Sequence, residues 1–182
     1  MLVEIGETSH GVLLDLRYGT ADNFTGNPVY RNPRCYLHRD AEALLARAAD
    51  LASRQGLRLK IFDAFRPSEA QWTLWNHTPD PDFLADPRRG SPHSRGVAVD
   101  LTLVDGAGRA LEMGTAFDAF AALSHHGSAA VAEAAQRNRY LLLGRMTAAG
   151  FDFYRNEWWH YQMFNSRRYP VLSDSVLPVP ML

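Results

Sequence analysis

The order of apolar and polar residues along the chain predicts a helix, a strand and a second helix in its first half. From Asp40 to Gln55 apolar residues recur at helical spacing, with Asp40 as candidate N-cap and Gly56 just past the end. Residues 57–65 alternate as strand residues do, and residues 67–75 open with a proline that suits the first turn of a helix. These elements all have lengths typical of a globular protein.

Further strands are expected on both sides of this segment. Residues 11–18 are read as a strand that leads into the turn-rich loop TADNFTGNP. Residues 97–104, VAVDLTLV, predict another strand, DGAG at 105–108 predicts a hairpin turn, and RALEM at 109–113 is expected to return antiparallel. The pattern therefore places a hairpin near the middle of the chain.

The remaining pattern predicts one long helix, one strand and two irregular segments. Ser128 is a candidate N-cap for a helix that ends at Ala149, where Gly150 follows as a stop. EWWHYQMF at 157–164 is the last predicted core element, and the four prolines of residues 76–92 indicate a surface connection. From about residue 166 we expect an irregular tail on the surface. Helices combined with an antiparallel hairpin predict an α+β fold, a single domain over residues 1–182 with a central antiparallel sheet flanked by helices.

Composition supports one globular domain and argues against several classes of protein. The chain has 182 residues, of which 46% are apolar, and a domain averages roughly 150 residues. Lys and Arg total 19 against 20 Asp and Glu, so no net field attracts nucleic acid or an anionic membrane. Cys35 is the only cysteine, which excludes an intrachain disulfide and a cysteine-rich zinc site. With neither a signal-peptide pattern nor a membrane-length apolar run, we expect a cytoplasmic protein with no membrane partner; a homo-oligomer is left open.

Two histidines and two acids have the spacing of metal-site residues. His93 precedes Asp100 by seven positions, and Glu157 precedes His160 by three. Two imidazoles and a carboxylate suit zinc, and three protein ligands leave the fourth tetrahedral position for water, which indicates catalysis. The competing interpretation from spacing alone makes all four ordinary turn, strand or surface residues. Strand alternation would place Glu157 and His160 on opposite faces, so their convergence requires a bend or a bulge.

Several motifs in a fixed order resemble the zinc-dependent D-alanyl-D-alanine dipeptidase family, within the wider group of D-Ala-D-Ala metallopeptidases. The signature S-x-H-x-x-G-x-A-x-D is met by Ser91, His93, Gly96, Ala98 and Asp100, and E-x-W-H by Glu157, Trp159 and His160. Further matches are RYGT with DNFTG at 17–26, DAFRP at 63–67, MGTAFD at 113–118 and SHH at 124–126. The resemblance runs from about Gly11 to Tyr161 and implies a hedgehog/D-Ala-D-Ala peptidase-like fold with a catalytic zinc in a cleft.

The resemblance also implies the residues that carry the reaction. One zinc per chain is expected on His93, Asp100 and His160, with Glu157 outside the metal shell as the catalytic base. The zinc would lower the pKa of a bound water to about 7, and Glu157 would accept its proton during attack on the peptide carbonyl. Spacing and resemblance thus indicate the same metal site.

Four further residues are implied as groups that contact the substrate. Arg66 is expected to stabilise the developing oxyanion, although from the residues alone a salt bridge to Asp63 or Glu69 is the ordinary interpretation. The substrate ammonium is expected at Asp118 and Tyr18, and the substrate carboxylate at Ser91. An Asp at this position can also cap a helix, and a Tyr that closes a strand is usually packed.

The implied activity is hydrolysis of the D-alanyl-D-alanine dipeptide to two D-Ala, in antibiotic resistance or in peptidoglycan recycling. The alternatives are a zinc D,D-carboxypeptidase or endopeptidase on larger cell-wall peptides, and an inactive zinc-bearing domain that binds peptides. Glu157 and Arg66 argue against the inactive domain, which needs neither a base nor an oxyanion group.

Two features depart from the motif or lie beside it. Residues 76–92 are shorter than the insertion of family members, and Pro92 replaces their usual small polar residue, which predicts a more tolerant pocket. The adjacent His125 and His126 are expected to form hydrogen bonds, with a second metal site as the alternative.

Overall fold

A five-stranded sheet in the order β2-β4-β5-β7-β6 forms the centre of the molecule. The computed structural model describes residues 1–182. The strands are β2 (Leu13–Leu14), β4 (Arg58–Asp63), β5 (Ala98–Val104), β6 (Phe151–Phe153) and β7 (His160–Met163). All neighbours pair antiparallel except β2, which runs parallel to β4 because a long crossover connects the two. The sheet is therefore mixed at one edge only, and the predicted α+β class is confirmed.

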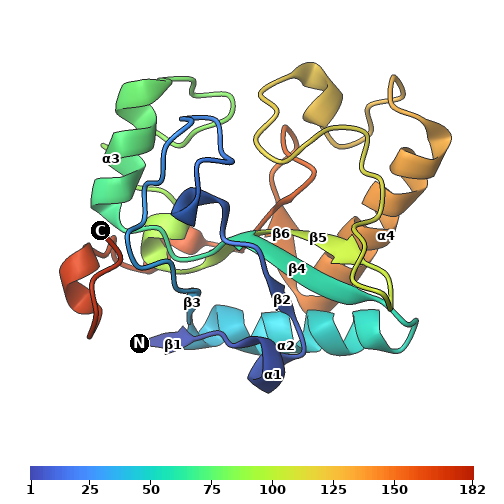
Figure 1. Cartoon of the computed structure of the whole chain (residues 1–182), viewed down its shortest axis with the longest axis horizontal. Helices are drawn as coiled ribbons and strands as arrows, with labels where there is room; N and C mark the ends of the chain where they lie inside the picture. Colours follow the sequence, from blue (N-terminus) through green and yellow to red (C-terminus); the bar gives the residue numbers. More distant parts are fainter.

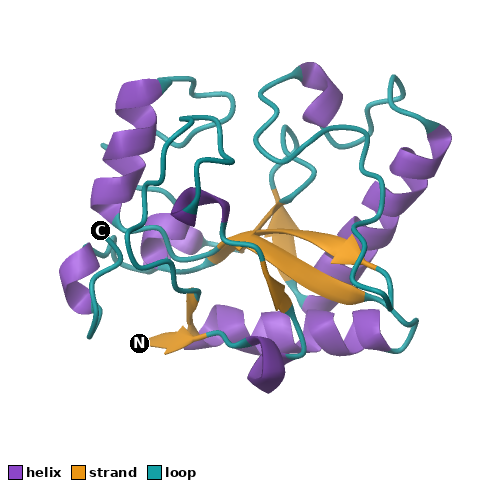
Figure 2. Cartoon of the chain, in the orientation of Figure 1, coloured by secondary structure: helices purple, strands orange, loops and turns teal.

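Four helices and a small second sheet surround these strands. The helices are α1 (Glu7–His10), α2 (Arg39–Ser53), α3 (Ser68–His77) and α4 (Glu133–Ala149). Figure 1 shows α2 running beneath the sheet while α3 and α4 stand at opposite ends of the molecule, and Figure 2 shows long loops on the side away from α2. Strands β1 (Leu2–Glu4) and β3 (Tyr36–His38) pair antiparallel beside α2. No helix is long and apolar enough to cross a membrane.

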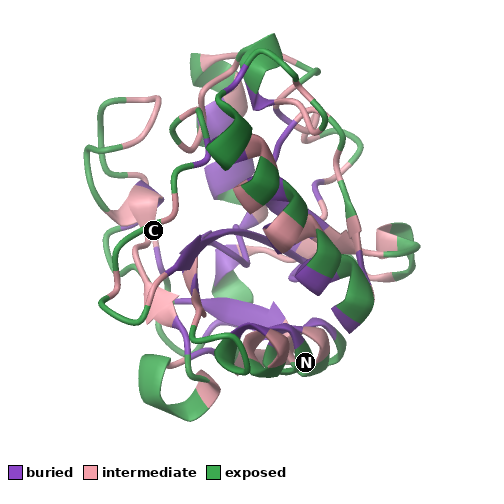
Figure 3. Cartoon of the chain, turned by 90° about the vertical axis from the view of Figure 1, so that its right-hand side faces the viewer, coloured by how far each residue is buried: buried purple, intermediate pink, exposed green.

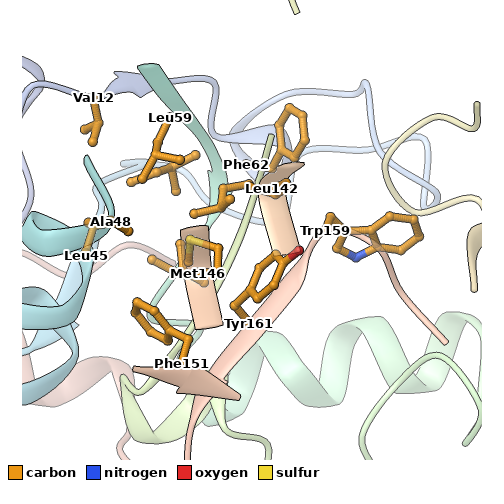
Figure 4. Packing of buried hydrophobic residues seen from close by; sticks show 14 of the residues in the cluster. Val12, Leu45, Ala48, Leu59, Phe62, Leu142, Met146, Phe151, Trp159 and Tyr161 are labelled. Atoms are coloured by element: carbon orange, nitrogen blue, oxygen red, sulfur yellow. The ribbon is translucent and has the colours of Figure 1, made fainter. Parts of the chain in front are cut away.

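Apolar side chains gather in two clusters, and the sheet is buried between its covering layers (Figure 3). In the larger cluster Leu45 of α2, Leu59 of β4 and Met146 of α4 converge from different elements (Figure 4). The smaller cluster contains Tyr18, Tyr30, Phe65, Leu74 and other residues around α3. Burial of this apolar surface is the main force that holds the loops against the sheet.

Several elements are shorter than predicted because the chain leaves the sheet to bury particular side chains. The strand expected over 11–18 is only Leu13–Leu14, after which a 3-10 turn (Arg17–Gly19) buries Tyr18. The expected antiparallel return after residue 108 is reduced to one bridge, between Val104 and Ala110.

The second half differs from the prediction at three places. The long helix begins at Glu133 rather than after Ser128, because the chain bends at Val131, which packs against Gly114, before the helix starts. The strand expected over 157–164 begins at His160, and β6 was not predicted.

The tail after residue 166 is irregular and mostly exposed, as predicted, but a few of its side chains are buried. Leu177 and Met181 are buried in the smaller cluster. Asp174 accepts hydrogen bonds from the backbone N–H groups of Met181 and Leu182, at 2.9 and 3.1 Å. The end of the chain is therefore part of the packed structure beside α3.

Candidate active site

Sheet register aligns three polar side chains across neighbouring strands. Asp100 of β5 is the direct partner of His160 in β7, and on its other side it faces Asp63 of β4. Directly opposed residues project from the same face of a sheet. A row of two carboxyl groups and one imidazole therefore crosses β4, β5 and β7.

His93 joins this row from a 3-10 turn that precedes β5. The turn, His93–Arg95, ends at Gly96, whose φ of +67° lies in the left-handed region. A Cβ at Gly96 would stand 2.6 Å from Leu2 Cδ2, the end of a flexible side chain, so the backbone conformation is the stronger reason for glycine. The glycine of the motif thus allows the chain to turn from His93 into the strand that carries Asp100.

The candidate metal ligands present three acceptor atoms to one another. His93 Nδ1 donates to the Ala64 carbonyl at 2.7 Å, and His160 Nε2 donates to Gln162 Oε1 at 3.0 Å. His93 Nε2 and His160 Nδ1 are thus left without protons, 3.1 Å apart and 3.3 and 3.0 Å from Asp100 Oδ1.

Three buried acceptors at such distances form a candidate site for a cation. His93, Asp100 and His160 are each less than a tenth exposed, and one ligand atom from each lies within 4.8 Å of the others. Two imidazoles with outward N–H groups already bonded, plus one carboxylate, form a donor set suited to zinc. The residues present therefore fit the implied metal.

Glu157 reaches the same place through a turn. Its N–H bonds the Tyr154 carbonyl, and β7 starts only at His160, so the chain bends between the two residues. The bend required by the sequence is therefore present, and Glu157 Oε2 lies 3.8 Å from His160 Nδ1. Burial, reinforced by Asp100 and Asp118, raises the pKa of the Glu157 carboxyl well above its usual value.

Arg66 is buried and held by three polar neighbours. Its Nε donates to Asp63 at 2.8 Å, Nη1 donates to Gln71 Oε1 at 2.9 Å, and Nη2 lies 3.5 Å from Asp100 Oδ2. The salt bridge to Asp63 is present, whereas Glu69 bonds Ser173 and the Asp174 backbone instead. Arg66 thus combines a buried ion pair with a place in the wall of the site.

Tyr18 and Asp118 form a pair on another wall. The Tyr18 hydroxyl donates to Asp118 Oδ2 at 2.9 Å, and Asp118 has a φ of +58°, uncommon for a non-glycine residue. Burial raises the pKa of Asp118, and an ammonium ion placed beside it would favour the charged form. Ser91 is also buried, and its Oγ accepts from the His93 N–H at 3.1 Å. This leaves the Ser91 O–H free to donate.

All eight residues predicted from the sequence line one cavity of about 300 Å³. They come from five separate stretches of chain: Tyr18, Arg66, Ser91, His93, Asp100, Asp118, Glu157 and His160. Pro81, Phe83, Leu84 and Ala85 also line it, so the short 76–92 connection borders the site as expected. A cavity of this size suits a small molecule.

The sequence analysis missed the residues that orient the site. Gln162, which bonds His160, stands two residues beyond it on the same face of β7, and strand alternation could have identified it. Gln71 lies in the first turns of α3, and only packing brings it to Arg66.

Against the expectation, the side chain of His125 forms no hydrogen bond, and neither does that of His126. Both its ring nitrogens are buried without a partner, its ring packs on Phe153 and Tyr161, and only its backbone N–H bonds the Arg155 carbonyl. Burial, followed by the Arg139 charge, lowers its pKa to about 4. The candidate metal cluster in the structure contains neither histidine.

Comparison with known proteins agrees with this arrangement. The profile of a family described as D-Ala-D-Ala dipeptidase matches residues 1–174. A D-alanyl-D-alanine dipeptidase of Escherichia coli strain K12 is 44% identical over 173 residues, covering 95% of this chain and 90% of the relative. Proteins of the same name from Enterococcus faecium and Streptomyces coelicolor are each 35% identical, covering 86% and 87% of this chain and 88% and 89% of their own length. The chain therefore belongs to the D-Ala-D-Ala dipeptidase family.

Proposed function

We propose that this protein hydrolyses the D-alanyl-D-alanine dipeptide to two molecules of D-Ala, with zinc as its cofactor. The observation that supports this most is the convergence of three buried acceptor atoms, a base, an arginine and an ammonium-binding pair on one small cavity. The names of the relatives supply the substrate, since each is called a D-alanyl-D-alanine dipeptidase.

His93, Asp100 and His160 would hold the metal through Nε2, Oδ1 and Nδ1. A zinc ion in such a site supplies an acidified water and polarises a peptide carbonyl. The Ala64 carbonyl and Gln162 keep the ring protons of the two histidines on the outward nitrogens.

Glu157 is the general base in this proposal. Its carboxylate accepts no hydrogen bond from the protein, and it lies beside His160 in the cavity wall, so it is available to accept a proton from the attacking water. Glu157 then passes this proton to the nitrogen of the breaking peptide bond. One water is consumed, a C–O bond replaces the C–N bond, and two free amino acids leave.

Arg66 stabilises the negative charge that develops on the carbonyl oxygen. Its Nε and one N–H of Nη1 are engaged by Asp63 and Gln71, whereas Nη2 has only a long contact, 3.5 Å, with Asp100. The guanidinium is therefore positioned in advance and has a donor to spare, as a group that acts on a transition state requires.

Selection for a free dipeptide follows from two groups that line the cavity. Asp118, oriented by Tyr18, attracts the substrate ammonium, and the Ser91 hydroxyl donates to the substrate carboxylate. A substrate whose amine is acylated loses its charge and leaves the Asp118 carboxylate without a cation beside it.

The test is hydrolysis by zinc-loaded protein of D-Ala-D-Ala, L-Ala-L-Ala and N-acetyl-D-Ala-D-Ala. We expect efficient cleavage of D-Ala-D-Ala alone, and loss of activity on removal of zinc by a chelator. Efficient cleavage of the acetylated peptide would replace the dipeptidase by a D,D-carboxypeptidase. Stoichiometric zinc without cleavage of any peptide would support the inactive binding domain.

A further inference from the structure

Arg139 of α4 is a buried arginine that forms no ion pair. It is 3% exposed, and its guanidinium donates to the carbonyls of Met113 at 2.6 Å, Leu123 at 2.8 Å and His125 at 3.2 Å. Removing a charged group from water is costly, and neutral carbonyls repay that cost only partly. A buried arginine whose guanidinium is hydrogen-bonded only to groups of one loop indicates that holding the loop is its contribution.

The bonded carbonyls lie at both ends of the loop that carries Asp118. The loop runs from residue 113 to residue 125 and contains only one short 3-10 turn, Ala122–Ser124. Asp118 lies outside this turn, so no helix or strand holds it in its left-handed conformation. From its position on α4, Arg139 therefore holds the two ends of the loop together.

The same loop separates the catalytic cavity from a second, larger one. That cavity, of about 750 Å³, is lined by Phe62, Thr102, Phe117, Asp118 and other residues, and Asp118 is its only residue that also lines the catalytic cavity. Phe117 stacks on Phe62 with ring centroids 4.8 Å apart. Asp118 therefore stands in the wall that the two cavities share.

The loop is also bonded to the turn that carries Glu157. Trp158 Nε1 donates to Thr115 Oγ1 at 2.8 Å, and the Trp158 N–H donates to the Ser124 carbonyl at 3.0 Å. Arg139 Nη2 contacts the same Thr115 hydroxyl at 3.4 Å. Thr115 belongs to the loop that carries Asp118, and Trp158 follows Glu157 in the sequence. The Thr115 hydroxyl, which contacts Arg139, therefore connects the loop of the proposed ammonium site to the turn of the proposed base.

We propose that Arg139 is a positioning residue that makes the enzyme selective for a free amine, by holding the 113–125 loop as the wall behind Asp118. This role of Arg139 rests on the proposed dipeptidase function. Arg139 does not line the catalytic cavity and would enforce the choice of a free amine from outside it. Without the guanidinium the loop ends separate, the Asp118 carboxylate shifts from its place beside Tyr18, and the larger cavity opens to the substrate amine.

The test compares kcat/KM for D-Ala-D-Ala and N-acetyl-D-Ala-D-Ala in Arg139→Met, Arg139→Lys and a matched control. Arg145→Met is that control, because Arg145 is a second buried α4 arginine without an ion pair, bonded to Leu141 and Gln55 away from the cavity. Selectivity is the ratio of the two kcat/KM values, which a smaller folded fraction leaves unchanged.

We expect selectivity to fall about 10- to 100-fold in Arg139→Met, through a higher KM for D-Ala-D-Ala, since misplacement by about 1 Å has effects of this size. Arg139→Lys, which keeps the charge but not the fork of donors, should recover part of the selectivity. Chymotrypsin should cleave within residues 113–125 of Arg139→Met and not of Arg145→Met.

Unchanged selectivity and protection in Arg139→Met, or equal changes in Arg145→Met, would overturn the inference. If Arg139→Met does not fold, Arg139→Lys and Thr115→Val carry the same comparison, and wild-type selectivity in both would likewise overturn it. A wild-type protein that does not cleave D-Ala-D-Ala refutes the proposed function instead, and the proteolysis result then decides the positioning role alone.

Discussion

Replacement of Gln162 by Met should weaken zinc binding without removing a ligand. Gln162 Oε1 accepts the Nε2 proton of His160 at 3.0 Å and thereby keeps His160 Nδ1 free for a metal. Gln162→Met retains the length of the side chain and loses the acceptor. Without this acceptor, the His160 tautomer that carries its proton on Nδ1 becomes more populated. That tautomer cannot bind the metal through Nδ1.

The size of the effect follows from the surroundings of Gln162. A neutral hydrogen bond contributes about 1 to 1.5 kcal/mol, and 1.4 kcal/mol corresponds to about tenfold in affinity. Because Gln162 is only half-buried, water can replace part of the lost bond. We therefore expect zinc affinity to fall about tenfold, near the lower end of the 10–100 range typical of such partners.

The assay is competition for zinc with a chromophoric chelator, after circular dichroism has confirmed that each variant is folded. Gln55→Met is the matched control, since Gln55 likewise accepts a side-chain hydrogen bond, from Arg145, but does not line the cavity. Wild-type affinity in Gln162→Met, or equal weakening in both variants, would refute the reasoning.

Further predictions concern the base, the arginine, the turn and the pocket. Glu157→Gln should retain zinc, measured by metal analysis, while kcat falls about 10²- to 10⁴-fold, because proton transfer is lost and no hydrogen bond is broken; loss of zinc would make Glu157 a ligand. Arg66→Met should lower kcat by an amount equivalent to about 3 kcal/mol, and chemical denaturation should show about 3 kcal/mol less stability, because Asp63 is left buried and unpaired; a higher KM at unchanged kcat would assign Arg66 to substrate binding. Gly96→Ala should lower the free energy of unfolding by at least about 1 kcal/mol, because φ is +67° there; a wild-type melting temperature would contradict this. The short 76–92 connection should allow D-Ala-D-Phe to be cleaved with less penalty than in relatives with the longer insertion, and equal strictness in kcat/KM would refute that expectation.

Sequence alone was sufficient where structure and chemistry depend on local spacing. The helix expected over 40–55 is α2 (Arg39–Ser53), and the strand expected over 97–104 is β5 (Ala98–Val104), because periodicity and end signals act within a few residues. The S-x-H-x-x-G-x-A-x-D motif is local in the same way. One turn, one glycine and one strand bring His93 and Asp100 together within eight residues of chain.

Tertiary structure decided everything that depends on which distant segments meet. Register sets Asp100 opposite His160, and a turn rather than a strand brings Glu157 beside them. Packing of the loops places Asp118 against Tyr18 and closes its loop on Arg139, contacts that join residues 14 to 100 positions apart in the sequence. Such contacts carry no periodic signal, because they depend on the shapes and partners that remain once the sheet and its helices have packed.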